Sequence, residues 1–480
     1  MGLCGRTAWV RLAVEMAVGM AGRMFLGSVF LGSAKGGSFL KNRMGSGPGW
    51  LAWSAGLTGL LGPAGHAPAQ STPGYLPLTP PPQDSGLAFL GSDSLHWWPR
   101  LSTAVVYDDN VLLLGKRHLA DTIGLVSPGL TLVAGETTDV LSGSTAVSSP
   151  GVTSLTAGGG TGAGGGINSG RRGLSSGSRG LSVDYSAGLS FYASQTGLNA
   201  VEHTARVNLA LPFSRLTLRL QQDVEVSAET PVDVGQRLAH TTYQTRLDLA
   251  YNLSDRTYLQ MEGGQTISEV ESGIGSRQWS TTVSANYRMS ERTTLGAGVS
   301  GGLLDVEDGD KQYFEQGRMR LGYEVSERVH LEASAGLEWR QFESGVATGV
   351  SPVFDLSGTY APGEQTRISL SGSRREQSSA TLAGQNYTST SVTASLNQQV
   401  AGWLAGVVTL NYANLDYSAA AGGVSSTRTD DTFGVLLGLS MPLTNRLLAS
   451  GYYQFRKNVS KESNLEYKNN RVGLALTWAY

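Results

Sequence analysis

The chain has 480 residues and a formal net charge of −2, so it carries no overall basic field that would attract nucleic acid. Glycine is abundant at 64 residues, only 15% of the residues are charged, and the hydrophobic fraction is 40%. This fraction is too low for a helical membrane protein, but it suits strands in which every second residue faces water.

The amino-terminal segment has the order of charge and hydrophobicity found in secretory signal peptides. Lys41 and Arg43 form a positive region, and an apolar stretch of about a dozen residues follows at 50–62. An A-x-A sequence ending at Ala69 predicts cleavage there, so we expect residues 1–69 to be a signal peptide with an extended amino-terminal region. A membrane anchor is the alternative, but the apolar run is too short to cross a bilayer as a helix.

Cleavage after Ala69 has two consequences for the mature chain. It removes Cys4, the single cysteine, and a chain without thiols excludes a disulfide framework, a zinc–thiolate site and a cysteine nucleophile. Such a chain also suits export through an oxidising periplasm. Residues 70–95 would then form a proline-rich periplasmic linker. A start codon at Met24 or Met44 is an alternative explanation for the unusual length of the amino-terminal region.

A glycine- and serine-rich insert at 135–180 interrupts the first predicted strands. Its sequence AGGGTGAGGG at 157–166 is of low complexity and typical of flexible chain. The alternative is a phosphate-binding loop, but no strand and no Lys-Ser or Lys-Thr pair follows these glycines. We therefore expect a flexible insert. Because an even number of predicted strands, two, precedes it, we expect it on the periplasmic side.

Long stretches of the remaining sequence alternate between apolar and polar residues. At 329–340, the residues Val329, Leu331, Leu337 and Trp339 share one face, and the polar or charged residues share the other. This period of two predicts a strand with one apolar and one hydrated face. The predicted strands are 100–109, 121–133, 181–194, 202–213, 216–229, 240–253, 257–270, 276–289, 293–307, 311–324, 329–343, 347–360, 366–379, 385–399, 403–418, 429–442, 447–460 and 466–480.

The length of these strands distinguishes a membrane barrel from a soluble sandwich. Most are about 10–15 residues long, whereas strands in soluble proteins average about 5–6 residues. A tilted strand that crosses the hydrocarbon layer needs about 9–11 residues. The pattern thus predicts an all-β protein, a transmembrane antiparallel up-and-down β-barrel of about 18 strands (16–18) at residues 96–480.

Short polar turns alternate with longer connections along the chain. The sequences at 254–256, 290–292 and 326–328 are SDR, SER and SER, and they are spaced by 36 residues. One repeat therefore holds two long strands, which is a hairpin and not a propeller blade. Short turns at one end and long loops at the other are typical of bacterial outer-membrane barrels, with the short turns periplasmic and the longer loops extracellular.

Aromatic residues support the same fold. Tyrosines and a tryptophan lie beside the short turns, as in an interfacial girdle, although strands favour aromatic residues in any protein. The last strand alternates fully and ends on Trp478 and Tyr480. This ending resembles the carboxyl-terminal strand by which outer-membrane proteins are recognised, so we expect these two residues to act as an assembly signal.

A family resemblance follows from motifs in residues 98–134. YDDN lies at 107–110, SPGL at 127–130, and a tyrosine-containing hairpin follows at 183–192. In these motifs the chain resembles the putative beta-barrel porin 2 family of outer-membrane proteins, over about residues 95–480. The resemblance implies an outer-membrane barrel, and members are often associated with exopolysaccharide gene clusters. The glycine-rich insert departs from the family pattern, and the family supplies no catalytic residues.

The alternation also assigns side chains to the two faces of the barrel. We expect Leu331, Leu337, Leu370 and Leu474 to face lipid, and Arg471 to face the lumen. A shift of one residue would place every charge in hydrocarbon. The other residues predicted to face the lumen are Arg219, Asp223, Glu225, Arg246, Asp248, Arg318, Arg320, Glu332, Glu338, Arg340 and Arg367. Their nearly balanced charges indicate no strong ion selectivity and suit neutral, hydroxyl-rich solutes.

The sequence suggests no enzyme. The six histidines are not at metal-ligand spacing, so no catalytic residue, cofactor or metal ion is expected. Asp108, Asp109 and Asn110 have the chemistry to bind a cation, but a turn or a hydrogen-bonded cluster at a strand end is the simpler explanation. A membrane enzyme is therefore the weakest of three hypotheses.

The first hypothesis is a porin-like conduit in the outer membrane of a Gram-negative cell, with polysaccharide export as its specific task. The second is a structural or surface-interaction barrel with a closed lumen. The expected partners are outer-membrane lipid and lipopolysaccharide, the outer-membrane assembly machinery, and periplasmic components of polysaccharide export.

Overall fold

The computed structural model describes the strands and most of the connections between them. The expected signal peptide, the linker and the glycine-rich insert lie outside the described residues. Within the described part, no helix is long and apolar enough to cross a bilayer. The described ranges are 95–116, 118–135, 180–228, 239–271, 273–343, 347–378, 385–419, 428–462 and 465–479.

The described residues form 18 strands and one short 3₁₀ helix at Thr196–Leu198. The strands are β1 (Leu95–Asp108), β2 (Asp121–Gly135), β3 (Gly180–Tyr192), β4 (Ala200–Pro212), β5 (Leu216–Ser227), β6 (His240–Asn252), β7 (Thr257–Val270), β8 (Ser276–Arg288), β9 (Thr293–Val306), β10 (Gln312–Ser326), β11 (Val329–Phe342), β12 (Ala347–Gly363), β13 (Thr366–Ser378), β14 (Gln385–Ala401), β15 (Leu404–Ala419), β16 (Thr429–Thr444), β17 (Leu447–Ser460) and β18 (Tyr467–Ala479).

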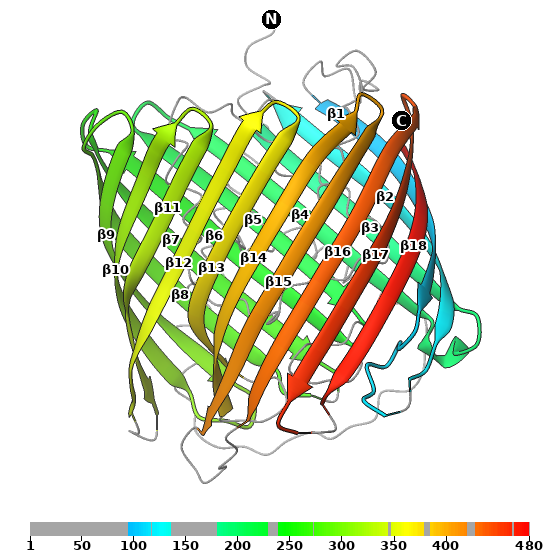
Figure 1. The fold of residues 1–480 in the computed structure, drawn as a ribbon. Coiled ribbons are helices and arrows are strands. Elements are labelled where there is room, and N and C mark those ends of the chain that lie inside the picture. Colours follow the sequence, from blue (N-terminus) through cyan, green and yellow to red (C-terminus); the bar gives the residue numbers. More distant parts are fainter. Residues whose placement is uncertain are drawn as a thin grey trace, which may run out of the picture. The chain divides into compact units, whose positions relative to one another are not determined.

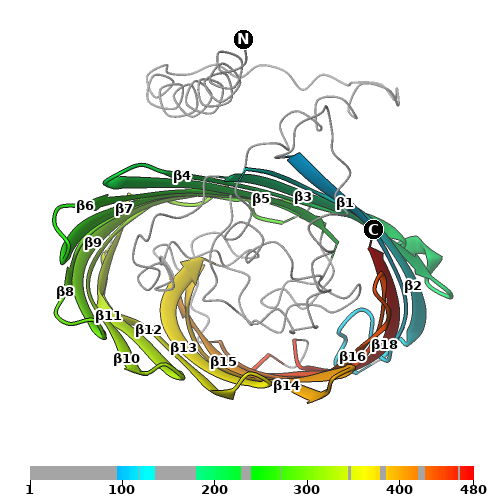
Figure 2. The same cartoon turned by 90° about the horizontal axis from the view of Figure 1, so that it is seen from above.

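Each strand pairs antiparallel with the strand that follows it in sequence, from β1–β2 through β17–β18. β1 also pairs with β18, where Arg100–Asp108 run opposite Arg471–Ala479. The strands therefore close into a ring without a free sheet edge (Figures 1 and 2). The predicted 18-stranded, antiparallel up-and-down barrel is confirmed.

Contacts between strands that are not neighbours identify the inner face of the ring. Arg320 on β10 lies 3.9 Å from Glu262 on β7, although β8 and β9 separate these strands. Gln312 on β10 exchanges hydrogen bonds with Asn386 on β14. Such contacts are possible only across the concave side of a curved sheet. The face that bears these polar side chains is therefore the inner one.

The outer face carries exposed apolar side chains at alternate positions. On β10, Met319 is 73% exposed, and Tyr313 and Tyr323 lie on the same face. The two tyrosines are ten residues apart, which is about 33 Å along a strand and about 25 Å along the axis of a barrel with tilted strands. This distance matches the height of the apolar band between the two aromatic girdles of outer-membrane barrels.

The two ends of the barrel differ in the length of their connections. The short turns comprise two to four residues and lie at the end that holds the carboxyl terminus, the upper end in Figure 1. They are 213–215, 253–256, 289–292, 327–328, 364–365, 402–403 and 445–446. Most connections at the other end are longer, for example 109–120 and 193–199. The predicted asymmetry is present.

The repeated serine at the short turns has a structural role. The Oγ atom of Ser254 accepts hydrogen bonds from the backbone N–H groups of Arg256, at 3.3 Å, and Thr257, at 3.1 Å. The hydroxyls of Ser290 and Ser326 accept the corresponding bond two residues on. A serine or threonine side chain can thus satisfy backbone donors that the turn leaves without a strand partner. This explains why a serine recurs at the start of these turns every two strands.

Candidate functional site

The inner face of the barrel holds nearly all the clustered polar chemistry that the structure describes, so it is the candidate functional site. On β5 and β6, Arg219 lies opposite Asp248, and Arg246 lies opposite Gln221. Arg206 of β4 forms an ion pair of 2.7 Å with Asp223. The charges of this part of the wall therefore alternate in sign across neighbouring strands.

A denser polar network covers the inner face of β10, β11 and β12. Arg318 donates to Asp355 at 2.7 Å and to Gln316 at 3.0 Å. Arg340 donates to Glu338 at 2.7 Å, and Gln316 bonds the other oxygen of Glu338. Each of these charges has a partner of opposite sign, and the residues are buried. The network thus carries no net charge, and its hydrogen bonds hold the inner side chains of these three strands in place.

The end of the β13–β14 hairpin leaves the wall and enters the ring. Pairing between β12 and β13 stops at Phe354 and Arg374, whereas β13 and β14 stay paired as far as Ser378 and Asn386. Figure 2 shows the arrowhead of β13 inside the ring. The consecutive residues Glu376 and Gln377 are both buried, so both faces of this hairpin end are covered.

Polar contacts hold the described residues of this hairpin end, 375–378 and 385–387, against the inner wall. Asn386 donates to Glu376 at 3.1 Å and to Gln312 at 2.9 Å, and Arg340 lies 3.8 Å from Glu376. Arg375 donates to Asp355 at 3.0 Å. The hairpin end therefore narrows the lumen near the longer loops. Its pairing to β12 has ended, so these side-chain bonds and the pairing of β14 with β15, which continues to Gln385 and Ala419, keep it in place.

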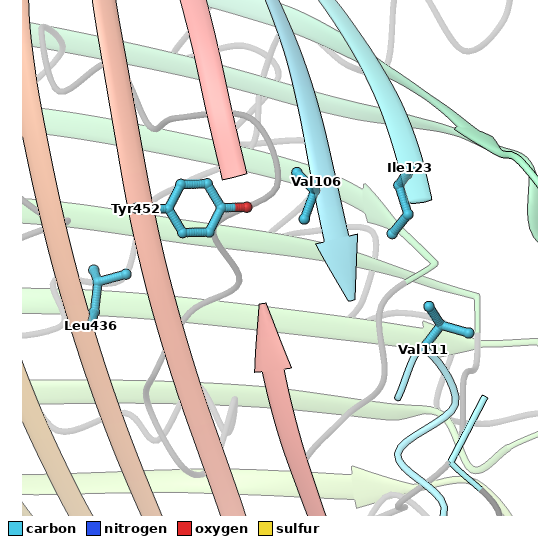
Figure 3. Packing of buried hydrophobic residues seen from close by; sticks show 5 residues of the cluster. All are labelled: Val106, Val111, Ile123, Leu436 and Tyr452. Atoms are coloured by element: carbon cyan, nitrogen blue, oxygen red, sulfur yellow. The ribbon is translucent and has the colours of Figure 1, made fainter. Parts of the chain in front are cut away.

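A second inward segment, residues 109–120, connects β1 to β2. Val111 of this segment packs with Val106, Ile123, Leu436 and Tyr452 in a buried apolar cluster (Figure 3). In Figure 3 the ring of Tyr452 points from β17 toward Val106 on β1. The segment is thus packed against the inner wall and also narrows the ring at this end.

The YDDN residues anchor this segment to β18. Asp108 accepts hydrogen bonds from Asn469 and Arg471, and Asp109 accepts two from Asn470, at 2.7 and 2.6 Å. The acidic groups are therefore occupied by protein donors. Among the described residues, no three His, Cys, Asp or Glu side chains group closely enough to hold a metal ion.

The SPGL sequence has a role on the inner face of β2. Arg100 lies directly opposite Gly129 and reaches past it to Asp184 on β3, with bonds of 2.6 and 2.8 Å. A Cβ atom at Gly129 would lie 2.7 Å from Nε of Arg100. A side chain at this position would displace Arg100, because the guanidinium crosses the strand here. Gly336 is similarly close to Arg318.

A hollow of about 760 Å³, open to solvent, lies at the short-turn end of the inner face. Its lining includes Arg288, Arg320, Glu332 and Tyr258 from four different strands. The guanidinium of Arg288 lies 5.3 Å from the ring centre of Tyr258. Cationic, acidic and aromatic groups therefore meet at the mouth opposite the inward hairpin.

The remaining predicted residues are more dispersed. Glu225 and Arg367 are exposed, and neither belongs to the network around Arg340. Trp478 is exposed on the outer face of β18, and Tyr480 lies outside the described residues. Asp355 was not predicted as a lumen residue, although the alternation of residues in its strand places it on the inner face. Other contact residues that were missed are Gln312, Gln316, Arg375, Glu376 and Asn386.

Comparison with a protein-family profile gives the relationship of the carboxyl-terminal part. The profile described as Putative beta-barrel porin 2 matches residues 308–480, about a third of the chain. Residues 308–480 match this family. The resemblance noted in the sequence is therefore confirmed there, and the motifs at 107–110 and 127–130 precede the matched part. Together, the family match and the closed ring make the chain a porin-like barrel of the outer-membrane type.

The chain also has a likeness to solved structures, at low sequence identity. The outer membrane protein opdK from Pseudomonas aeruginosa is 14% identical, covers 82% of this chain and 100% of its own, and gives a TM-score of 0.38. OccAB3 of Acinetobacter baumannii is 10% identical, covers 80% of this chain and 99% of its own, and gives a TM-score of 0.37. A bacterial polysaccharide outer membrane secretin is 9% identical, covers 80% of this chain and 98% of its own, and gives a TM-score of 0.31. No curated protein matches the chain.

Proposed function

We propose that the chain is a passive conduit for hydrophilic solutes in the outer membrane of a Gram-negative cell, and that it serves polysaccharide export. The observation that carries the proposal is the closed ring of 18 strands with a polar and charged inner face. Barrels of 16–18 strands enclose an aqueous lumen, whereas barrels of about eight strands are filled by their own side chains.

The composition of the inner face supports an uncharged or weakly charged solute. Arginines are matched by acids, as in the pairs Arg318–Asp355 and Arg206–Asp223. Hydroxyl and amide groups, among them Ser334, lie between them. A lumen of this kind exerts no strong field on ions and offers donors and acceptors to sugar hydroxyls.

The second candidate is a structural barrel with a closed lumen. The two inward segments favour it, because residues 109–116 and 375–378 both occupy space inside the ring near the longer loops. A conduit and a closed barrel differ in one measurable property, the current carried by a single inserted barrel. Catalysis has no comparable support from the geometry of the inner face.

The test is conductance in a planar lipid bilayer. We expect the purified full-length mature protein to give discrete current steps, and a neutral polysaccharide added to one side to reduce them. The double variant Glu376→Ala with Asn386→Ala removes contacts of the inward hairpin, so its steps should be larger. Ser395→Ala removes a wall hydrogen bond to Thr409, 3.2 Å long, and is the matched control.

The outcomes separate the two candidates. Barrels that insert but carry no current, in both the parent and the double variant, would refute the conduit and favour the structural barrel. Current steps that neutral polysaccharide leaves unchanged would refute polysaccharide as the solute. Recovery of the protein in the inner-membrane or soluble fraction of cells would refute the proposed location.

A further inference from the structure

Two lysines lie directly opposite each other on the outer face of the barrel, at the end with the longer loops. Lys457 of β17 pairs in register with Lys468 of β18, and both side chains are exposed. The Lys468 ammonium lies 5.8 Å from the ring centre of Phe455. Like charges in directly opposed positions of a sheet repel one another. The lysine pair, Lys457 and Lys468, therefore weakens this part of the sheet unless an anion lies between the two ammonium groups.

Three acids lie near the lysine pair, and among the described residues Glu466, two residues before Lys468, forms no ion pair with either lysine. The carboxylate of Asp109 is occupied by Asn470, which donates both its backbone and its side-chain N–H. Asp431 accepts hydrogen bonds from the hydroxyl of Tyr412 at 2.8 Å and from Asn414 at 3.0 Å. Within the described part of the chain, neither lysine forms an ion pair with a carboxylate. The positive charge of the pair is thus available to an external group.

The height of the lysine pair on the barrel indicates where that group lies. Lys468 is ten residues from Trp478 on the same face of β18. Between them the outward residues include Val472, Leu474 and Leu476, all exposed and apolar. Ten residues of a tilted strand rise by about 25 Å, the height of the apolar band. Trp478 and the lysine pair therefore mark opposite boundaries of the membrane.

We propose that the lysine pair is a binding site for the phosphate group of an outer-leaflet lipid. Two ammonium groups provide donors and charge for a phosphate at headgroup level. The acyl chains would lie against the apolar residues below, such as Val472 and Leu474 on β18, and Phe433 on β16 lies beside Lys457. This inference rests on the proposed outer-membrane location but not on an open lumen, so a negative conductance result leaves it intact.

Native mass spectrometry of the full-length mature barrel in detergent tests the site. The probes are diphosphoryl lipid A, the same lipid with both phosphates removed, and inorganic phosphate. We expect Lys457→Gln or Lys468→Gln to weaken binding of the diphosphoryl lipid about 5-fold, and the double variant about 30-fold. The control is Arg277→Gln, because Arg277 is also exposed on the outer face at this end but lies opposite Asp305.

Two further measurements distinguish weaker lipid binding from loss of folding. Heat-modifiability on a gel shows whether each variant is folded, and Lys457→Arg with Lys468→Arg keeps the charge and should retain the lipid. Equal binding by the parent and the double glutamine variant would overturn the proposal. So would equal binding of the dephosphorylated lipid, or occupation of the site by inorganic phosphate with the same affinity.

Discussion

Met319 provides the sharpest test of the orientation of the strands. Its side chain is 73% exposed on the outer face of β10, four residues from Tyr323 and six from Tyr313. Four residues of a tilted strand correspond to a rise of about 10 Å, so Met319 lies near the middle of an apolar band about 25 Å high. Met319→Arg places a charge at that depth, where Arg costs about 2–4 kcal/mol.

The matched control adds the same charge to the inner face of the same strand. Gly322 lies inside, and a Cβ atom there would come no closer than 3.8 Å to any neighbouring atom. Gly322→Arg would point into the hollow beside Glu332 and should fold as the parent does. The assay is refolding into lipid vesicles across a urea series, with the folded fraction read from heat-modifiability. Equal urea midpoints for Met319→Arg and Gly322→Arg would refute the assignment of the two faces.

Three further predictions follow from other positions. Leu370→Arg should cost less stability than Met319→Arg, about 0–1 kcal/mol. The reason is that Leu370 lies only two residues beyond the position opposite Tyr360 and is therefore near the membrane boundary. Ser369→Arg should be tolerated, and the urea midpoints of both variants are measured in the same series. Gly129→Leu should displace Arg100 and cost about 1.5–3 kcal/mol, the contribution of a charge-assisted bond, measured as the shift of the urea midpoint. The mature protein should begin near Gln70, as read by amino-terminal sequencing of the outer-membrane fraction.

Each of these predictions can fail in a defined way. A larger loss for Leu370→Arg than for Met319→Arg would contradict the heights assigned to them. The control for Gly129 is Gly124→Leu on the outer face of β2, where the nearest atom is 3.9 Å from an added Cβ. If both glycine variants lost the same stability, the crossing of Arg100 would not be the cause. Recovery of residues 1–60 in the folded protein would contradict cleavage near Gln70.

The sequence predicted the strands because a barrel wall repeats one simple rule. In β11, every second residue from Leu331 to Trp339 is exposed at the outer face or only partly covered, and Glu338 and Arg340 are buried inside. Burial on one face fixes the register, so the alternation carries enough information to place each strand. The short turns were predicted for a similar local reason, because the serine side chain accepts hydrogen bonds from the backbone of its own turn.

The inward segments could not be predicted from that rule. Glu376 and Gln377 are consecutive, and alternation would send one of them toward lipid, yet both are buried. The departure depends on contacts with Arg340 and Gln312, which are far away in the sequence. The role of Gly129 was hidden for the same reason, since only the pairing of β1 with β2 shows that Arg100 crosses it.

The pairing of β1 with β18 has a consequence for biogenesis. The first and last strands of the ring are hydrogen-bonded neighbours, so a chain that lacks β18 would have two open edges, on β1 and on β17. In hydrocarbon each unpaired backbone group costs several kcal/mol, and an edge exposes a whole row of them. A partly built ring therefore cannot rest in the bilayer alone. Until the carboxyl-terminal strand arrives, another protein must cover both edges, or the entire ring must form before it enters the membrane.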